Sequence, residues 1–356
     1  MGKGGRGKVR RRPTSEGRDK ERRQMAGNDS SWLRFCLLFT LLCLAIHGLI
    51  SWLPESWLFL ANAVTACSLA AALRLVGLDS AVQGVVVSAG GFAVSIVPEC
   101  TVLFAAGLFA AFVASYPASP RDRLLGILIG IPALFVVNTA RLQAVFVAGW
   151  MKREWFDFIH VYLGQVMTVA FVFLACRVWL RFVRGREAGS EQLREMGWFW
   201  LRFLGVSAVL FIAWMMLNRH YVGVIDQVLL WAFHMAGRDL QITRQLDLYY
   251  PTFSVVTFVA LVASTRSLEA RDKWKSLALG LGILFLLHLA HRACNVFLVA
   301  YRMPAFDHWA VIVRTFAQYL LPILFWLYWT RPQADLGTQA AALRDEARVP
   351  LADRRF

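Results

Sequence analysis

Long apolar runs separated by short basic segments are the feature that most limits what this chain can fold into. A transmembrane helix needs about 20 apolar residues, because the hydrocarbon core of a bilayer is roughly 30 Å thick. Runs that approach or exceed this length cover residues 33–53, 101–116, 124–149, 159–182, 199–217, 252–265, 276–300 and 310–330. Hydrophobic residues make up 58% of the 356 residues, above the roughly 45–50% of soluble domains. The sequence therefore predicts an all-α polytopic membrane protein.

Basic loops decide the orientation and the role of two further apolar stretches, 56–77 and 224–236. If 56–77 crossed the membrane, the Arg-rich segments at 121–123 and 181–194 would lie outside the cell. If it lies along the outer face, every basic loop is cytoplasmic, which the positive-inside rule favours. We therefore expect about eight transmembrane helices in a bacterial inner (plasma) membrane, with the N- and C-termini cytoplasmic.

The second half of the chain resembles the first. The tetrapeptide WLRF occurs at 32–35 and again at 200–203, and each copy opens an apolar run. The sequence around Arg141 also resembles that around Arg292. Four spans per half predict two parallel repeats, related by an axis along the membrane normal.

Each repeat is also expected to carry a surface helix and a short extracytoplasmic hairpin. Val85–Val87 and Phe92–Val97 flank Ser-Ala-Gly-Gly at 88–91, which is a hairpin signal, and residues 240–249 alternate in the same way. Because an open sheet edge cannot face lipid, both hairpins should lie at the outer surface.

The basic N-terminus accounts for much of the net charge of +15. We interpret residues 1–31 as a disordered basic cytoplasmic arm that enforces orientation and contacts anionic lipid. Aromatic residues are absent from its basic part, so nucleic acid is not an expected partner.

Three polar residues on separate runs are predicted to share one depth near the outer face. Cys100 and His160 each begin an inward run, and Arg141 lies about 25 Å along the run between them at 1.5 Å per residue. Asn138 is three residues before Arg141, on the same helical side. Singly, Cys100 is more often explained by packing and His160 by the interface, whereas Arg141 inside an apolar run favours function by itself, with snorkelling to headgroups as its alternative. Their coincidence in depth favours a functional site, since charge inside a membrane is costly.

The chemistry of this group is that of a cysteine nucleophile. An adjacent His or Arg lowers the pKa of a thiol towards a reactive thiolate. His160 can act as general base towards Cys100 and then as general acid towards a leaving amine. Arg141 stays charged and can stabilise a thiolate or an oxyanion, and Asn138 can orient Arg141 or donate to the same oxyanion.

No cofactor or metal is expected. The six cysteines form no CxxC pair, so neither a disulfide framework nor a zinc site is indicated. Metal binding by His288, His291 and His308 is a weaker alternative, because no acidic ligand accompanies them.

The same residues, in the same order, are similar to the exosortase/archaeosortase family, membrane cysteine transpeptidase-like sorting enzymes. The matching segments are Glu99-Cys100-Thr101, Asn138-Thr139-Ala140-Arg141 and His160-Val161-Tyr162-Leu163-Gly164. The resemblance covers about residues 56–182 and, with His as the third member, favours the bacterial branch. Val102 departs from the family, which usually has Gly there.

The resemblance implies a catalytic set of Cys100, Arg141 and His160, with Cys100 as nucleophile. Asn138, Glu99 and Thr101 are the expected supporting residues. It further implies cleavage of C-terminal sorting signals of exported proteins, each a short motif, a transmembrane helix and a basic tail, with transfer to a surface acceptor.

The second repeat has no such set, because the positions matching Cys100 and His160 fall near Phe253 and Val313. We therefore predict a degenerate second repeat. The predicted units are a basic arm (1–31), a catalytic membrane repeat (32–183), a cytoplasmic linker (184–198), a degenerate membrane repeat (199–331) and a cytoplasmic tail (332–356).

Two other functions stay open on the sequence alone. A catalytically silent scaffold of an envelope or polysaccharide export system would need no reactive thiol at Cys100. A transporter would need paired intramembrane polar sites at the repeat interface, for which only Arg141 and Arg292 are candidates.

Overall fold

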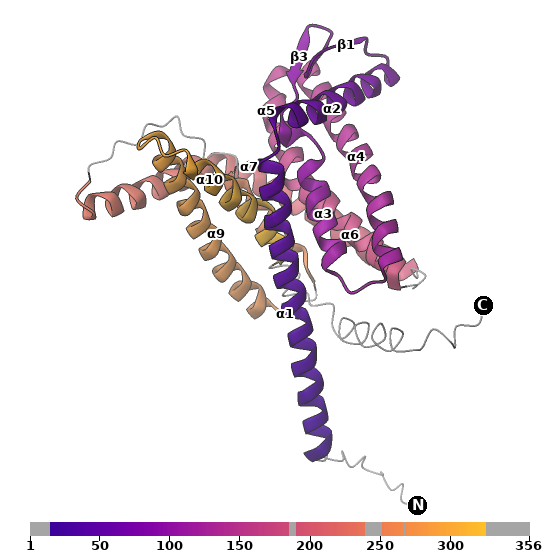
Figure 1. Ribbon diagram of the computed structural model, residues 1–356, viewed down its shortest axis with the longest axis vertical. Coiled ribbons are helices and arrows are strands. Elements are labelled where there is room, and N and C mark those ends of the chain that lie inside the picture. Colours follow the sequence, from indigo (N-terminus) through magenta and orange to yellow (C-terminus); the bar gives the residue numbers. More distant parts are fainter. Residues whose placement is uncertain (1–14, 185–189, 239–250, 267, 325–356) are drawn as a thin grey trace, which may run out of the picture.

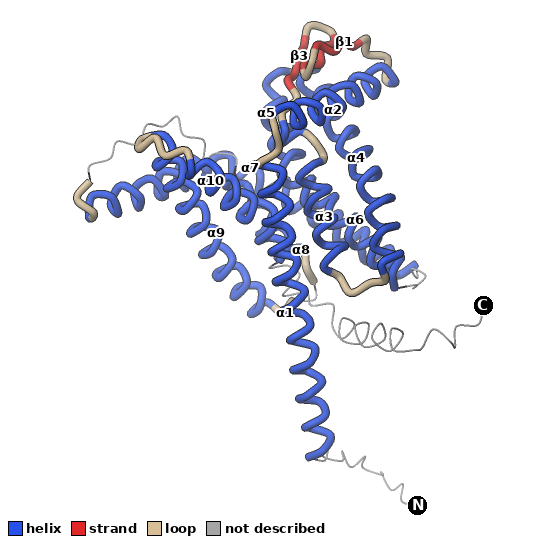
Figure 2. Tube along the Cα trace, in the orientation of Figure 1, coloured by secondary structure: helices blue, strands red, loops and turns tan. Residues whose placement is uncertain are grey.

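The computed structural model describes residues 15–184, 190–238, 251–266 and 268–324. This part of the chain is almost entirely helical, with one small sheet at one end (Figures 1 and 2). Its upright helices form a bundle, and a second group of helices leans away from that bundle (Figure 1).

Within the described residues, six helices are long and apolar enough to cross a membrane. They are Trp32–Ser51, Glu55–Leu75, Pro120–Met151, Arg153–Val183, Gly197–Met235 and Ala270–Val299. Two shorter apolar helices, Leu103–Ser115 and Pro251–Ser264, fall on further predicted spans. The predicted span at 310–330 lies partly outside the described residues. A helical polytopic membrane protein is thus confirmed, while the count of eight and the parallel repeats stay predictions.

The first half folds around four upright helices. Its helices are α1 (Ser15–Ser51), α2 (Glu55–Leu75), α3 (Leu103–Ser115), α4 (Pro120–Met151), α5 (Arg153–Val161) and α6 (Thr168–Arg184), with the π-helical segment η2 (Tyr162–Met167) between the last two. Figure 1 shows α2 lying across the upper end of the bundle of α1, α3, α4 and α6. A helix across the end of the bundle is compatible with the prediction for 56–77, but α2 has the length and hydropathy of a span, so its position relative to a membrane stays a prediction.

Helix α1 begins at Ser15, so the prediction that residues 1–31 are disordered is wrong for residues 15–31. Residues 1–14 lie outside the described part. The physical reason is that the apolar span already provides the costly helix nucleus, and each added residue needs only propagation. The preceding sequence is rich in Glu, Lys, Arg and Gln, which are good helix formers.

The predicted hairpin forms, with one more strand than expected. The strands are β1 (Ser80–Gln83), β2 (Val86–Ala89) and β3 (Phe92–Ser95), antiparallel in the order β1-β2-β3. Gly90 and Gly91 make the turn between β2 and β3 with φ values of 56° and 80°, which favour glycine and suit a tight hairpin. The second predicted hairpin, at 240–249, lies outside the described residues.

From its 3-10 turn onwards, the described second half repeats the order of the first: a 3-10 turn, two helices, a short helix and a π-helical segment. It contains α7 (Ser190–Met235), the 3-10 turn η3 (Pro251–Phe253), α8 (Ser254–Ser264), α9 (Ala270–Val299), α10 (Ala305–Thr315) and the π-helical segment η4 (Phe316–Leu320). Helix α7 is continuous, so the prediction of a span at 199–217 separate from a helix at 224–236 is wrong. No Pro or Gly-Pro pair interrupts this stretch, so nothing in it ends the helix. It also takes up residues 190–198 of the predicted linker.

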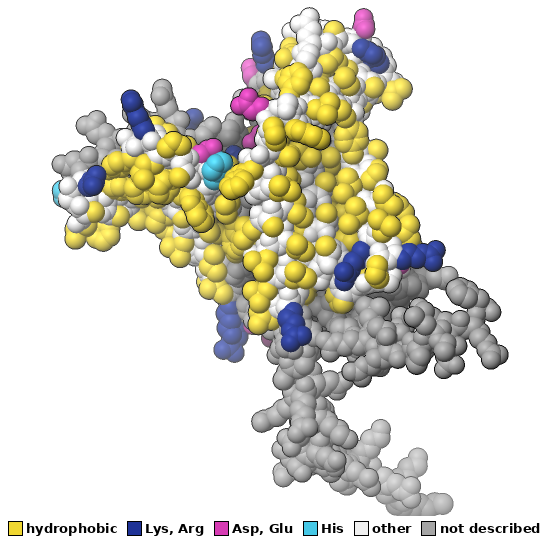
Figure 3. Space-filling model, viewed as in Figure 1, with side chains coloured by type: hydrophobic (Ala, Val, Ile, Leu, Met, Phe, Trp, Pro, Cys, Tyr) yellow, Lys and Arg dark blue, Asp and Glu magenta, His cyan; other side chains and the backbone are white. Residues whose placement is uncertain are grey.

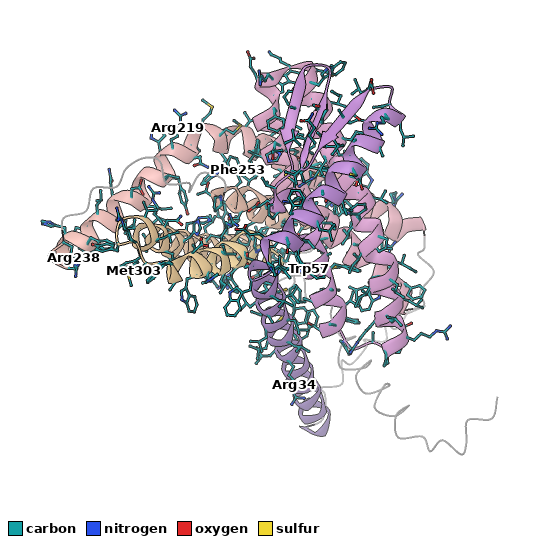
Figure 4. All side chains as sticks on the ribbon, turned by 45° about the horizontal axis from the view of Figure 1, so that its top comes forward. Arg34, Trp57, Arg219, Arg238, Phe253 and Met303 are labelled. Carbon is teal, nitrogen blue, oxygen red and sulfur yellow. The ribbon has the colours of Figure 1, made fainter. Side chains whose placement is uncertain are left out.

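Aromatic contacts join the elements of the bundle and the two halves. Phe35 of α1 packs edge-on against Phe112 of α3, with ring centroids 5.7 Å apart. Phe211 of α7 lies 5.1 Å from Tyr162 of the first half and 4.8 Å from Phe253. Figure 4 shows Phe253 deep in the molecule, while Arg219 and Arg238 lie along the arm of α7 that extends away from the bundle. Edge-on and tilted aromatic pairs of this kind add to the stabilisation by burial.

The surface of the bundle is that of a membrane protein. Figure 3 shows apolar side chains covering most of this face, with Lys and Arg side chains gathered at the lower and upper borders of the apolar zone. Exposed large apolar side chains lie on several of the long helices, Leu41 on α1, Leu128 on α4 and Ile212 on α7 among them. A contiguous apolar surface of this size needs an apolar solvent.

Candidate active site

The segment that carries Cys100 is a short 3-10 turn between the sheet and α3. It spans Pro98–Cys100, and proline is well placed at the first position because its φ angle is already helical. Thr101 closes the turn, since its Oγ1 donates to the Pro98 carbonyl at 2.7 Å. Cys100 itself is buried, with 5% of its surface exposed, and packs in a cluster with residues of α2, the sheet and α4. The hydrogen bond that closes the turn and the packing around Cys100 therefore hold the thiol in one place.

Helix α4 contacts the same turn with two side chains from one helical side. Asn138 donates from Nδ2 to the Cys100 carbonyl at 2.9 Å, and Arg141 approaches that carbonyl with Nη2 at 3.4 Å. The spacing of three residues puts both on one face. A cationic and a neutral donor thus meet at the backbone of the candidate nucleophile, as the predicted common depth of Cys100 and Arg141 requires.

Arg141 also connects α4 to the segment after His160. Its Nη1 donates to Thr168 Oγ1 at 3.1 Å. A Cβ on Gly164 would lie 3.8 Å from the same Nη1, so the guanidinium rests against the π-helical segment η2. Arg141 is 7% exposed. Its buried charge therefore joins two chain segments instead of reaching the headgroups by itself.

His160 lies in the last turn of α5, directly before η2. Its ring stacks on Phe156 at 5.4 Å, and Phe156 in turn lies 5.6 Å from Phe92 of β3. The imidazole is half-buried. The structure thus joins Cys100, Asn138 and Arg141 directly, and places His160 on α5, just before the segment that Arg141 contacts at Gly164 and Thr168.

The ionisation of Cys100 depends on opposing influences. Burial raises the pKa of the Cys100 thiol above its ordinary value, and Glu99 raises it further. A hydrogen bond with the backbone of Val97 and the charge of Arg141 lower the pKa, but burial outweighs them. The resting residue is therefore a thiol, and a general base is needed to make it a nucleophile.

Two residues of the site were missed in the sequence. Thr168 could not be identified as a site residue from the sequence, because threonine is common inside apolar runs. Arg314 contacts Glu99, with Nη2 to Oε1 at 3.4 Å, and comes from the second half, which was predicted to be degenerate and to contribute no residue to the site.

The histidines considered as metal ligands have separate partners. His288 is hydrogen-bonded to Tyr221 and Ser254, His291 to the carbonyl of Ala310, and the ring of His308 lies beside Trp52. In the part of the chain that the structure describes, no three His, Cys, Asp or Glu side chains are grouped as metal ligands.

The comparisons with known proteins bear on the first half. Residues 25–177 match the family model described as transmembrane exosortase (Exosortase_EpsH). No curated protein and no solved structure matches the chain. The matched segment contains Glu99, Cys100, Asn138, Arg141 and His160, the residues from which the site is built. Through this segment the protein, a multi-pass membrane protein, is similar to the transmembrane exosortase family.

Proposed function

We propose that this protein is an integral-membrane cysteine protease or transpeptidase that cleaves C-terminal sorting signals of exported proteins at the outer face of the bacterial inner membrane. The observation that carries the proposal is the double contact of Asn138 and Arg141 with the Cys100 carbonyl. It lies within the segment that matches the family.

In the proposed reaction, His160 accepts the proton of the Cys100 thiol as the thiolate attacks the scissile carbonyl. The tetrahedral intermediate collapses to a thioester, the C–N bond breaks, and the protonated imidazole gives its proton to the leaving amine. An acceptor nucleophile or water then attacks the thioester and releases Cys100. The proton that this nucleophile loses returns through His160 to the thiol.

Arg141 has two parts in this proposal. Its positive charge lowers the pKa of the Cys100 thiol, which favours the attacking form. Its bonds to Thr168 and to the Cys100 carbonyl hold the nucleophile and the segment that follows His160 at a fixed separation. Such preorganisation matters because small misplacements of reacting groups reduce rates strongly.

The substrate class is the one that the similarity to exosortases implies, and it is compatible with a membrane setting. A helix followed by a basic tail would insert beside this protein with the tail on the cytoplasmic side. The hairpin, α2 and α5 lie at one end of the bundle (Figure 1). If this end is the outer face, as the basic loops predict, the motif that precedes the helix would reach it. A surface acceptor for the cleaved protein completes the proposal.

The test compares C-terminal proteomes of membranes from cells that carry the wild-type protein or Cys100→Ser. We expect proteins that end in a helix and a basic tail to be trimmed only with the wild type. Arg141→Ala should abolish trimming and His160→Ala should reduce it strongly, whereas Phe253→Ala should leave the chemistry intact. Identical proteomes with a folded, membrane-inserted Cys100→Ser variant would refute the assignment of the nucleophile.

A catalytically silent scaffold is the second candidate. The burial that raises the pKa of the Cys100 thiol favours it, because a scaffold needs no thiolate. It predicts that Cys100→Ser leaves every cellular phenotype of the protein unchanged.

A further inference from the structure

The second half of the molecule reaches the candidate nucleophile through one ion pair. Arg314, in the last turn of α10, lies 3.4 Å from the carboxylate of Glu99, the residue before Cys100. The two residues are 215 positions apart in the sequence. Their side chains are 33% and 53% exposed, so the pair lies at the accessible edge of the site.

The place of Arg314 in its own half corresponds to that of His160. His160 is two residues before the π-helical segment η2, which begins at Tyr162, and Arg314 is two residues before η4, which begins at Phe316. In the same order of elements, Phe253 ends the Pro-initiated turn η3 as Cys100 ends η1. The second half therefore presents a permanent cation at the position where the first half has an imidazole.

Packing between the halves holds Arg314 at this position. The ring of Trp52, directly after α1, lies 5.8 Å from that of His308, which is on α10 with Arg314. On the other side of the site, the Tyr162 hydroxyl is 3.0 Å from Ser207 Oγ of α7. The second half thus contacts both segments of the site, the one that bears Cys100 and the one that follows His160.

We propose that Arg314 is a positioning residue for the nucleophile, supplied by the second half, and that it neutralises the Glu99 carboxylate beside the Cys100 thiol. The inference rests on the proposed function for its biological meaning, but the ion pair and its effect on the thiol can be measured without any substrate.

We expect the ion pair to affect the ionisation of the Cys100 thiol much more than the stability of the fold. An exposed ion pair adds little to the free energy of unfolding. A carboxylate on the residue next to a titrating thiol, however, opposes thiolate formation, and Glu99 raises the pKa of Cys100. Coulomb energies between charges on adjacent residues correspond to roughly three- to hundredfold in an ionisation equilibrium, depending on the local dielectric constant. Arg314 offsets this repulsion.

The experiment measures alkylation of Cys100 by iodoacetamide in the full-length protein, in membranes, from pH 6 to 10. The other cysteines are replaced by alanine: Cys36, Cys43, Cys67, Cys176 and Cys294. We expect Arg314→Gln to slow alkylation at pH 7.5 about fivefold and to move the pH midpoint upwards. Arg314→Lys should stay within twofold of the parent, because it keeps the charge.

A second variant separates charge from folding. Adding Glu99→Gln to Arg314→Gln removes the carboxylate that Arg314 neutralises, so the rate should return to that of the parent. Arg271→Gln, on an exposed position at the start of α9, is the matched control and should change nothing.

Three results would overturn the inference. These are an Arg314→Gln rate equal to that of the parent, a double variant as slow as Arg314→Gln, and a parent whose Cys100 is not alkylated even at pH 10. The proposed function fails separately, if Cys100→Ser leaves the C-terminal proteome unchanged while the alkylation rates still depend on Arg314.

Discussion

At the scale of single residues, the site is organised around a backbone carbonyl. Asn138 and Arg141 meet at the carbonyl oxygen of Cys100, which orients the residue without occupying its thiol. A side-chain contact to the sulfur itself would compete with substrate. Because Asn138 and Arg141 bind the carbonyl, the thiol stays available for reaction with a substrate, while the conformation of the turn is restricted.

Replacing Asn138 by alanine should reduce processing strongly and lower the free energy of unfolding by about 1 kcal/mol. The matched control is Gln143→Ala on the same helix. Gln143 makes the same kind of bond, from Nε2 to the Ala72 carbonyl at 3.0 Å, but to α2. Both variants should lose similar stability in thermal unfolding, and only Asn138→Ala should lose processing. Equal losses of processing in the two variants would contradict a role for Asn138 at the site.

The pH dependence of Cys100 is a second prediction at this scale. Burial raises the pKa of the thiol, so the midpoint of alkylation against pH should lie above the value of about 8.5 of an ordinary thiol. Arg141→Gln removes a charge that lowers this pKa, so the midpoint should move still higher. A midpoint below 8 would show that burial does not dominate the ionisation of Cys100, and a downward shift in Arg141→Gln would show that the charge of Arg141 does not lower the pKa of the thiol.

At the scale of elements, the sheet, α4 and α5 meet in one aromatic contact that supports His160. Phe92 of β3 and Phe156 of α5 pack against each other where α4 passes closest, at Gly149. A Cβ on Gly149 would lie 2.6 Å from Phe92 and 2.8 Å from Phe156. The absence of a side chain on α4 thus allows the imidazole stacked on Phe156 to take its position.

Gly149→Ala should therefore displace Phe156 and with it His160. We expect a loss of about 1–3 kcal/mol in the free energy of unfolding from overpacking, and a loss of processing. Gly205→Ala on α7 is the control, because a Cβ there has no neighbour within 4 Å; it should be neutral or slightly stabilising. Partial recovery on adding Phe92→Leu would confirm the steric cause, and full activity of Gly149→Ala would exclude it.

At the scale of the whole molecule, the second half is held by its own buried ion pair. Arg292 of α9 contacts Asp226 of α7, with Nε to Oδ1 at 2.7 Å, and its side chain is 1% exposed. The sequence marked Arg292 as the counterpart of Arg141 but did not identify Asp226 as its partner. Arg141 instead contacts Thr168 and the Cys100 carbonyl. The two arginines therefore differ in these partners: Arg292 contacts a carboxylate of another helix, whereas Arg141 contacts a hydroxyl and the backbone carbonyl of the candidate nucleophile.

Arg292→Ala should leave the Asp226 carboxylate without its counter-charge inside the protein and lower the free energy of unfolding by about 3–5 kcal/mol. The double variant Arg292→Met with Asp226→Leu should recover most of this loss, because it removes both charges. Thermal unfolding in detergent measures both effects. A double variant as unstable as Arg292→Ala would show that the ion pair is not the source of the stability.

The sequence by itself determined the class of the protein, its apolar helices, the β2–β3 hairpin and the shared depth of Cys100 and Arg141. These follow from local properties, since hydropathy, helical spacing and turn residues act within a few residues. Only the tertiary structure decided the partners of the charged groups, Glu99 with Arg314 and Asp226 with Arg292. Such pairs join positions 66 and 215 residues apart, and which buried or exposed charges meet depends on how whole helices pack, a property that no local pattern of residues carries.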